Sequence, residues 1–224
     1  MTTILSLGGS LIVPKKIDTN FLKKFRKIIL GYINMGNTVG IICGGGKTCR
    51  DYIAAAKAIR DIKYPDPDLI GIMSTRLNAE LVRVIFSDYA YKKVIYNCTE
   101  KIKTSKRVLI GAGGQPGCTS DTDSVLLAEN LHADTIINLT NIDYVYDKDP
   151  RKFKDAKPIK QISWENFIKT IGDKYKAGIN VPFDPIASKK AYKLKLKVII
   201  LNGKNLKNLK NCLNGKNFKG TIIS

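Results

Sequence analysis

The chain has 224 residues, of which 44% are hydrophobic and 25% charged, and these proportions are ordinary for a globular protein. Lysine and arginine number 38 against 19 acidic residues, so the formal net charge is +19 and anionic partners are favoured. The single histidine, His132, makes a histidine-based zinc site or a Ser-His-Asp triad hard to build, which excludes much hydrolase chemistry.

Strands, glycine-rich turns and helices alternate along the chain. In chain order, a strand at 3–7 precedes a helix within 21–33, and a strand at 39–43 precedes a helix within 52–59, with one apolar face formed by Tyr52, Ile53, Ala56 and Ile59. A helix at 71–87 is followed by strands at 94–96 and 108–110, a helix at 122–131 and a strand at 135–139. Beyond a charged loop at 147–155, the pattern predicts a helix at 164–171, a proline-containing segment at 181–185, a helix at 186–194 and a strand at 198–201.

The apolar strands lack the polar alternation of a half-exposed sheet. Strands of this kind, separated by helices, favour a mostly parallel sheet that is covered on both faces. We therefore predict an α/β fold, a three-layer α/β/α sandwich that forms a single domain over residues 1–224.

Three glycine-rich turns, at 8–10, 44–46 and 111–117, each follow a predicted strand. Ligands of open parallel sheets bind at the carboxyl ends of the strands, where glycine permits close approach and the first helical N–H groups attract anions. Arg50 comes one helical turn after Gly46, so its guanidinium could donate to a phosphate held there. The alternative for each turn is a tight connection without a ligand, and for Arg50 an ordinary surface arginine.

Two familiar nucleotide motifs are near misses. The segment GGGKT is not a Walker A loop, because that motif needs glycine at position 41, which is Ile41. Gly111, Gly113 and Gly117 are spaced one residue too widely for the dinucleotide-binding fingerprint. Neither motif therefore accounts for the glycine turns.

Six motifs are distributed over nearly the whole chain. In chain order they are LSLGGSL at 5–11, GGGKTCR at 44–50, PGCTSD at 116–121, NIDYVYDKDP at 141–150, DPIASKKA at 184–191 and GTII at 220–223. Together they resemble the archaeal-type uridylate kinases of the amino-acid-kinase family. The resemblance implies transfer of the γ-phosphate of ATP to UMP, giving UDP and ADP for pyrimidine biosynthesis. It further implies that Mg²⁺ is held mainly by ATP phosphates rather than by a protein metal site, and that the protein is a homo-hexamer. The N-terminal half, about residues 1–130, would bind the acceptor, and the C-terminal half, about residues 131–224, would bind ATP.

The same resemblance assigns roles to individual positions. The catalytic residues would be Asp121, Lys189 and Arg50. The ATP-binding residues would be Gly9, Ser10, Gly46, Arg50, Thr140, Asn141, Tyr146 and Asp149. The UMP-binding residues would be Gly45, Asp68, Gly114, Gln115, Pro116, Gly117, Cys118, Thr119 and Ser120. The competing interpretation is helix capping for Asp68 and Asp121 and a surface position for Lys189.

Three positions depart from the pattern of the family. Ser6 stands where many relatives have a catalytic lysine, so Lys47 or Lys189 would supply the missing charge. Tyr144 stands where a glycine is usual, which leaves the local turn conformation open. Asp123 replaces an apolar residue, and would either assist Mg²⁺ or interact with the helix dipole.

Other functions remain open from the sequence. A different small-molecule kinase of the same fold is the nearest alternative, and a non-catalytic nucleotide-binding or RNA-binding protein of this fold is the other. No RNP-like motif accompanies the basic residues, so nucleic acid is not the expected partner. Five cysteines without a CxxC pair, no export signal and no long apolar segment predict a cytoplasmic protein that binds no membrane.

Overall fold

The computed structural model describes residues 1–148, 150, 152–171 and 181–224. A seven-stranded sheet crosses the molecule in the order β3-β2-β1-β4-β8-β9-β7. Strands β1 (Thr2–Leu7), β2 (Thr38–Cys43), β3 (Val108–Gly111), β4 (Thr135–Thr140) and β8 (Lys197–Asn202) are mutually parallel. Only β9 (Thr221–Ile223) runs antiparallel to its neighbour β8, and β7 (Gln161–Ile162) is parallel to β9. The carboxyl ends of the five parallel strands therefore meet at one edge.

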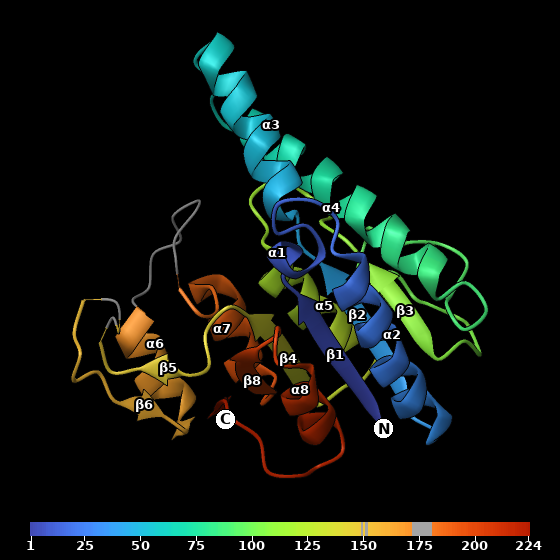
Figure 1. Cartoon of the computed structure of the whole chain (residues 1–224), viewed down its shortest axis with the longest axis vertical. Coiled ribbons are helices and arrows are strands. Elements are labelled where there is room, and N and C mark those ends of the chain that lie inside the picture. The colour runs from blue at the N-terminus through green and yellow to red at the C-terminus, as the bar shows by residue number, and fades with distance from the viewer. Residues whose placement is uncertain (149, 151, 172–180) are drawn as a thin grey trace.

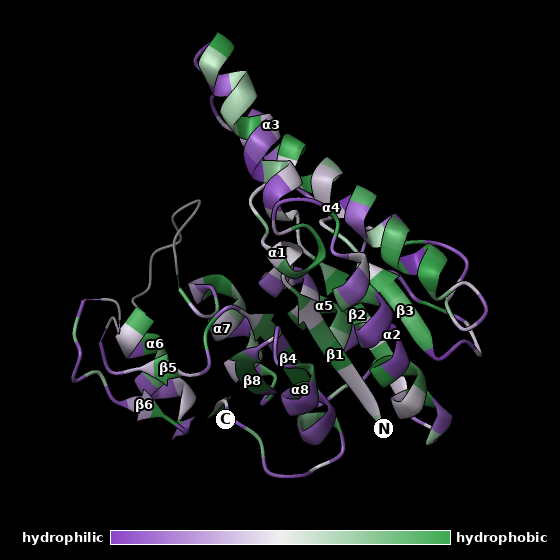
Figure 2. Ribbon diagram, in the orientation of Figure 1, coloured by the Kyte–Doolittle hydropathy of each residue, from purple (hydrophilic) through white to green (hydrophobic). Residues whose placement is uncertain are grey.

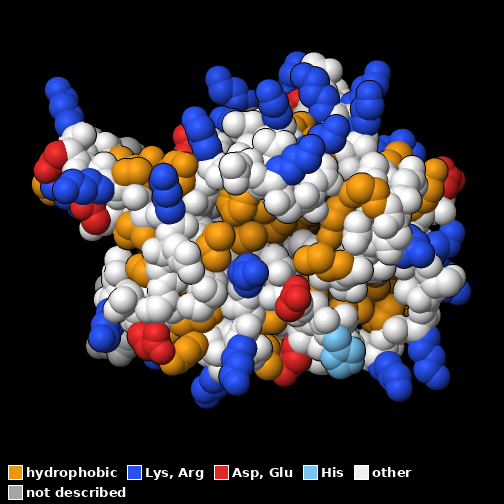
Figure 3. Space-filling view, turned by 90° about the horizontal axis from the view of Figure 1, so that it is seen from below, with side chains coloured by type: hydrophobic (Ala, Val, Ile, Leu, Met, Phe, Trp, Pro, Cys, Tyr) orange, Lys and Arg blue, Asp and Glu red, His pale blue; other side chains and the backbone are white. Residues whose placement is uncertain are grey.

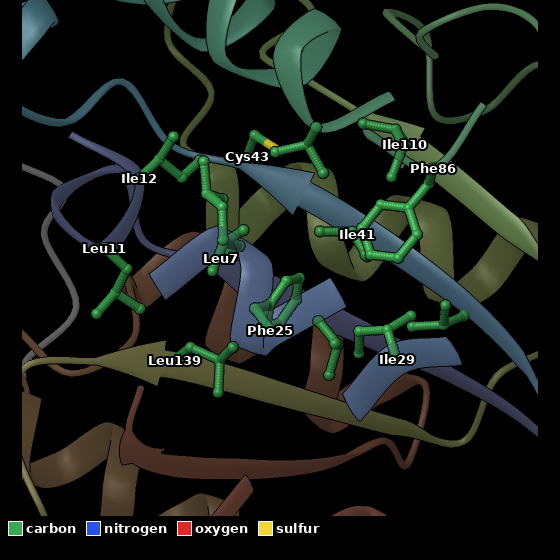
Figure 4. Close-up of a cluster of buried hydrophobic side chains, with 14 of the residues drawn as sticks. Leu7, Leu11, Ile12, Phe25, Ile29, Ile41, Cys43, Phe86, Ile110 and Leu139 are labelled. Atoms are coloured by element: carbon green, nitrogen blue, oxygen red, sulfur yellow. The ribbon is translucent and has the colours of Figure 1, made fainter. Parts of the chain in front are cut away.

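Helices cover both faces of this sheet (Figure 1). On one face, α1 (Gly9–Ile12), α2 (Thr19–Asn34), α4 (Asp66–Ile85) and α8 (Leu206–Leu213) enclose a core in which Phe25, Ile29, Phe86 and Leu139 lie together (Figure 4). On the other face, α5 (Ser120–Asn130), α6 (Trp164–Ile171) and α7 (Pro185–Lys193) pack around Trp164, Phe167 and Phe183. The predicted three-layer α/β/α sandwich is confirmed. The five parallel strands are buried along nearly their whole length, as expected of strands that are covered on both faces.

Helix α3 (Gly46–Ile59) forms where the sequence predicted a helix, but it contains no buried residue. It extends beyond the sheet and lies beside α4 (Figure 1). Tyr52 and Ile59 of its predicted apolar face are 66% and 85% exposed, and apolar residues are visible along the projecting helix in Figure 2. Periodicity identified the helix correctly, but it could not show that the apolar face has no core to cover within one chain.

Several local predictions need correction. Residues 94–96 do not form a strand: Ile95 and Ala90 make only isolated bridges to Gly111 and Val108. The segment 91–93 between the two bridges includes two exposed lysines, and the backbone pairing with β3 does not continue through it. Helix α4 begins at Asp66 rather than 71, since Pro67 fits the first turn of a helix. The two-residue strands β5 (Val145–Tyr146), β6 (Pro158–Ile159) and β7, together with the short elements α1 and β9, were not predicted and are too short for a periodic signal. Helix α8 was also missed, although Leu206, Leu209 and Leu213 recur at helical spacing in it.

The surface is strongly basic. Lysine and arginine side chains project around the whole outline of the face in Figure 3, with few acidic groups between them. Among the described helices, none combines the length and the apolar character that crossing a membrane requires.

Candidate active site

The ends of β1 and β2 carry two glycine loops that pack backbone against backbone. A Cβ on Gly9 would lie 2.1 Å from Gly46 N, and a Cβ on Gly46 would lie 2.2 Å from Gly9 O. Gly46 also has φ +65, a conformation that favours glycine. Gly44 N donates to Leu7 O at 3.0 Å, which ties the second loop to β1. We call Gly8, Gly9 and Gly44–Gly46 the glycine cluster.

Asn78 of α4 holds the second loop in place. Its Nδ2 donates to Gly44 O at 2.8 Å and to Gly45 O at 3.1 Å, and the residue is only 3% exposed. Gly45 is the N-cap of α3 and contributes no side-chain cap. In the first turn of the helix, Lys47 N donates to Val13 O at 3.0 Å, so the other N–H groups of this turn are the ones that an anion would meet. This arrangement is a ready anion site at a helix N-terminus.

Two cationic residues follow on α3. Arg50 lies one turn after Gly46 on α3 and is exposed. Lys47 Nζ instead lies 2.7 Å from Asp51 Oδ2 in an exposed i,i+4 pair. An exposed pair of this kind is weak, but it directs the Lys47 ammonium along the helix.

The order of the strands changes direction between β1 and β4, the place where ligands enter doubly wound sheets. Gly8 N donates to Leu139 O at 3.3 Å there. Thr140 ends β4, and its Oγ1 accepts from Ile142 N at 3.2 Å. Asn141, the next residue, and Ser10, which follows β1, are both exposed. These predicted ATP-binding positions thus occupy the carboxyl edges of β1 and β4.

The remaining predicted ATP positions lie farther along the chain. Tyr146 belongs to the separate β5–β6 pair, where its ring meets Tyr144 edge to face at 6.4 Å. Among the described non-glycine residues, positive φ occurs only at His132 and Lys195, so Tyr144 needs no left-handed turn. Asp149 lies outside the described residues.

A carboxylate pair occupies the starts of α5 and α7. Asp121 Oδ2 accepts from Asp184 N at 3.0 Å, and Asp121 Oδ1 lies 3.5 Å from Asn138 Nδ2. Asp184 caps α7, its Oδ1 accepting from Ile186 N at 2.8 Å and Ala187 N at 2.9 Å. Its other oxygen accepts from the Thr119 hydroxyl. We call Asp121, Asp184, Thr119 and Asn138 the carboxylate cluster.

Electrostatics distinguish this cluster. Burial, together with the negative charge of Asp184, raises the pKa of Asp121 to about 7, although the Asp184 backbone amide opposes the shift. A carboxylate pair in this state favours cationic groups nearby. Lys189, five residues after Asp184 on α7, is exposed, and the described contacts do not join it to Asp121.

The acceptor loop, residues 113–119, connects β3 to α5. Gly117 has φ +82, and its N–H donates to Asp68 Oδ2 at 2.8 Å. Thr119 is the N-cap of α5 and accepts from Thr122 N at 3.2 Å. The other predicted UMP positions lie along the same path: Gly114 and Pro116 are half-buried, Gln115 and Cys118 are exposed, and Ser120 begins α5.

Several site residues were not identified from the sequence: Asn78, Thr75, Arg76, Asn138 and Asp184. Asn78 offered a weak signal, a polar residue on a face that buries Ala79 and Val82. Asp184 offered a clear one, since Asp before Pro marks the start of a helix. Arg76 had none, because its partners are backbone carbonyls 37 and 38 residues away.

Known proteins share this architecture over the full length of the chain. The sequence pattern of the amino acid kinase family matches residues 1–202. The chain belongs to the amino acid kinase family. It is 37% identical over 227 residues to uridylate kinase from Sulfurisphaera tokodaii, covering 100% of this chain and 99% of the relative. It is 36% identical over 228 residues to uridylate kinase from Methanococcus aeolicus, covering 100% of both.

Solved structures agree. Uridylate kinase from Archaeoglobus fulgidus superposes with a TM-score of 0.86 at 32% identity, covering 100% of both chains. UMP kinase from Bacillus anthracis has a TM-score of 0.80 at 22% identity over 100% of this chain and 95% of its own, which shows the shared fold. The resemblance predicted from the six motifs is confirmed at the level of family and fold.

Proposed function

We propose that this protein is a UMP kinase that transfers the γ-phosphate of ATP to UMP. The observation that carries the proposal is the glycine cluster, where two strand ends meet without side chains at the uncapped N-terminus of α3. Such a surface suits a chain of phosphates that must approach the backbone closely. Full-length similarity to proteins named uridylate kinase supports UMP as the acceptor.

The two nucleotides would lie on either side of the glycine cluster. UMP would lie toward α4 and the acceptor loop, with Gly45 at its phosphate and Asp68 at its ribose; one Asp68 oxygen already accepts from Gly117 N. ATP would lie across the ends of β1 and β4, with Gly9 and Ser10 at its phosphates. Thr140, Asn141, Tyr146 and Asp149 would hold its adenosine.

In the transfer step, an oxygen of the UMP phosphate forms a bond to the γ-phosphorus while the bond to the bridging oxygen of ADP breaks. Charge spreads over the equatorial oxygens, so positioning and cationic stabilisation dominate the catalysis. Arg50 and Gly46 would meet the transferred group. Lys47 or Lys189 would supply the cation missing at Ser6, and the exposed pair of Lys47 with Asp51 is too weak to prevent Lys47 from turning to a phosphate. Asp121 would orient these cations.

ATP would bring Mg²⁺, which neutralises phosphate charge when bound. The carboxylate oxygens nearest the site already accept hydrogen bonds within the protein: Asp121 accepts from Asp184 N, and Asp184 accepts from two amides of α7. This donor set favours a metal ion held mainly by ATP phosphates and water, rather than one in a cage of side chains.

We also infer a homo-oligomer, a hexamer by family resemblance, that acts in the cytoplasm. Large apolar side chains on α3 and α4 support association: Ile59, Met73 and Leu77 are 85%, 62% and 65% exposed. The five cysteines are free thiols, which suits a reducing compartment.

The test is release of ADP with UMP, CMP, AMP and GMP as acceptors. We expect a strong preference for UMP, and equal rates with all four would contradict the assignment. Arg50→Ala and Asp121→Asn should fold and lose turnover by about 100-fold or more. Lys57→Ala, on the exposed surface of the same helix as Arg50, is the matched control and should keep full activity. Salt-sensitive RNA binding without turnover would favour a non-catalytic protein of this fold.

A further inference from the structure

The first two residues of the acceptor loop have their backbone polar groups engaged by side chains. Gly113 N donates to Thr75 Oγ1 at 2.9 Å. Arg76 Nε donates to Gly113 O at 3.2 Å, and its Nη2 donates to Gly114 O at 3.1 Å. Asp123 lies against the same residue, since a Cβ on Gly114 would be 3.6 Å from Asp123 Oδ1, and the Gly114 amide stabilises the charged form of this carboxylate and so lowers its pKa. Three side chains therefore fix the conformation of this dipeptide.

The dipeptide Gly113–Gly114 is also closely packed against Thr75 and Tyr96. A Cβ on Gly114 would lie 2.6 Å from Tyr96 O, and a Cβ on Gly113 would lie 2.9 Å from Thr75 Oγ1. The Arg76 guanidinium is itself stacked 4.4 Å from the centre of the Tyr96 ring. Because these contacts leave no free space around Gly113 and Gly114, a change in Thr75, Arg76 or Tyr96 shifts the acceptor loop.

The buried carboxylate of Asp123 lowers the stability of the folded state. It is 4% exposed, and its Oδ2 has no hydrogen-bond partner within the described part of the chain. Burial raises its pKa to about 7, against the opposing effects of the Gly114 amide and Arg76. Helix α5 does not need this carboxylate as a cap, since Thr119 already provides one. A buried group that lowers stability calls for another explanation, and the contact with Gly114 supplies it.

We propose that Arg76 and Asp123 are positioning residues that hold the acceptor loop in the shape that binds UMP. They reach the same dipeptide from α4 and α5, which cover opposite faces of the sheet. This inference rests on the proposed function, because it takes the loop to be the UMP-binding segment. Both residues act through the loop, so their removal weakens UMP binding and leaves ATP binding unchanged.

Steady-state kinetics of the full chain test the proposal. Arg76→Met and Asp123→Ala should each raise the KM for UMP about tenfold, while kcat and the KM for ATP change by less than about twofold. Arg83→Met is the matched control, since Arg83 is on the same helix but pairs with Glu80. Arg76→Lys keeps a hydrogen-bond donor and Asp123→Asn keeps an acceptor, so each should retain part of the affinity for UMP that Arg76→Met and Asp123→Ala lose. Equal increases in the KM for ATP and for UMP would overturn the proposal.

Hydrogen exchange at the Gly113 and Gly114 amides provides a readout that needs no catalysis. Both amides should exchange faster in Arg76→Met and Asp123→Ala, and unchanged protection would also overturn the proposal. If the parent protein fails to phosphorylate UMP, the proposed function is wrong, while the exchange result still decides whether these side chains hold the loop.

A pH profile separates Asp123 from a passive packing role. The titratable groups that face it are Arg76 on α4, Cys98 after the Ile95 bridge, and Cys118 in the loop. The UMP phosphate titrates in the same range, so the parent and Asp123→Asn are compared at each pH. The difference in KM for UMP should be larger at pH 8.5, where Asp123 is charged, than at pH 6. A difference independent of pH would contradict a role for the charge.

Discussion

The glycine cluster and the carboxylate cluster lie at the same edge of the sheet but are constructed by opposite means. The first is uncharged backbone, with Gly9 and Gly46 so close that neither admits a side chain, and one amide, Asn78, ties it to α4. The second consists of side chains, with Asp121 and Asp184 sharing a backbone hydrogen bond. The first is therefore sensitive to added atoms, whereas the second is sensitive to changes of charge and hydrogen bonding.

The largest effect is expected from an atom added to the glycine cluster. Gly9→Ala would place a methyl group 2.1 Å from Gly46 N, and backbone on both sides must shift. We expect a loss of more than about 3 kcal/mol in the free energy of unfolding, measured by urea denaturation, and no detectable turnover. The control is Gly31→Ala in α2, where the new methyl group meets nothing within 4 Å. That variant should be more stable by about 0.5–1 kcal/mol, and similar losses in both would refute the distinction.

The next effect comes from removing the one side chain that holds the glycine cluster. Asn78→Ala leaves Gly44 O and Gly45 O without their buried donor and should destabilise by about 2–3 kcal/mol. Asn78→Asp places an acceptor oxygen against the same carbonyls and should be at least as harmful. Asn34→Ala, at the exposed end of α2, should stay within about 0.5 kcal/mol of the parent in the same denaturation experiment. If Asn78→Asp matches the parent, the amide donor is not required.

The sequence predicted the two clusters to different degrees. Glycine after an apolar strand has a direct physical meaning, so the turns at 8–10 and 44–46 were placed correctly, and the apolar runs at 3–7 and 39–43 predicted the strands that carry them. Asp121 was found only through a resemblance to a family. Its role depends on Asp184, which is 63 residues away, and no local pattern links the two.

The failures have a common cause. Periodicity reports which face of an element is apolar, but not what covers that face. The spacing predicted one apolar face on α3, yet no residue of this helix is buried, and Tyr52 and Ile59 of that face are exposed. Residues 94–96 are apolar enough for a strand, yet only Ile95 of that run makes a bridge to β3. The hydrogen-bond acceptors of Arg76 are the backbone carbonyls of Gly113 and Gly114, and a backbone acceptor leaves no trace in residue types.

A smaller effect is expected in the carboxylate cluster, where substitution can preserve the shape. Asp184→Ala removes the acceptor for Ile186 N and Ala187 N and should destabilise by about 1–2 kcal/mol. Asp184→Asn keeps an acceptor oxygen and should lose less than half of that. Removing the negative charge in either variant should also lower the pKa of Asp121, because Asp184 raises it. Carboxyl titration followed by NMR measures this shift, and an unchanged Asp121 pKa would show that the two carboxylates are not coupled.

The smallest effect concerns stability against pH. The pKa of Asp121 rises on folding from its ordinary value of 3.8 to about 7. Between these values the folded chain binds a proton that the unfolded chain has released, so the Asp121 contribution falls as pH rises from about 4 to 7 and levels off above 7. Over the last part of this range, from pH 6.5 to pH 8, the loss is about 0.8 kcal/mol, so we expect the Tm of the parent relative to Asp121→Asn to fall by about 3 °C. Asp61→Asn, at an exposed carboxylate, should show no such change. A Tm difference between parent and Asp121→Asn that is constant with pH would mean that Asp121 is already ionised in the folded chain, and the carboxylate cluster would then need a bound cation to remain folded.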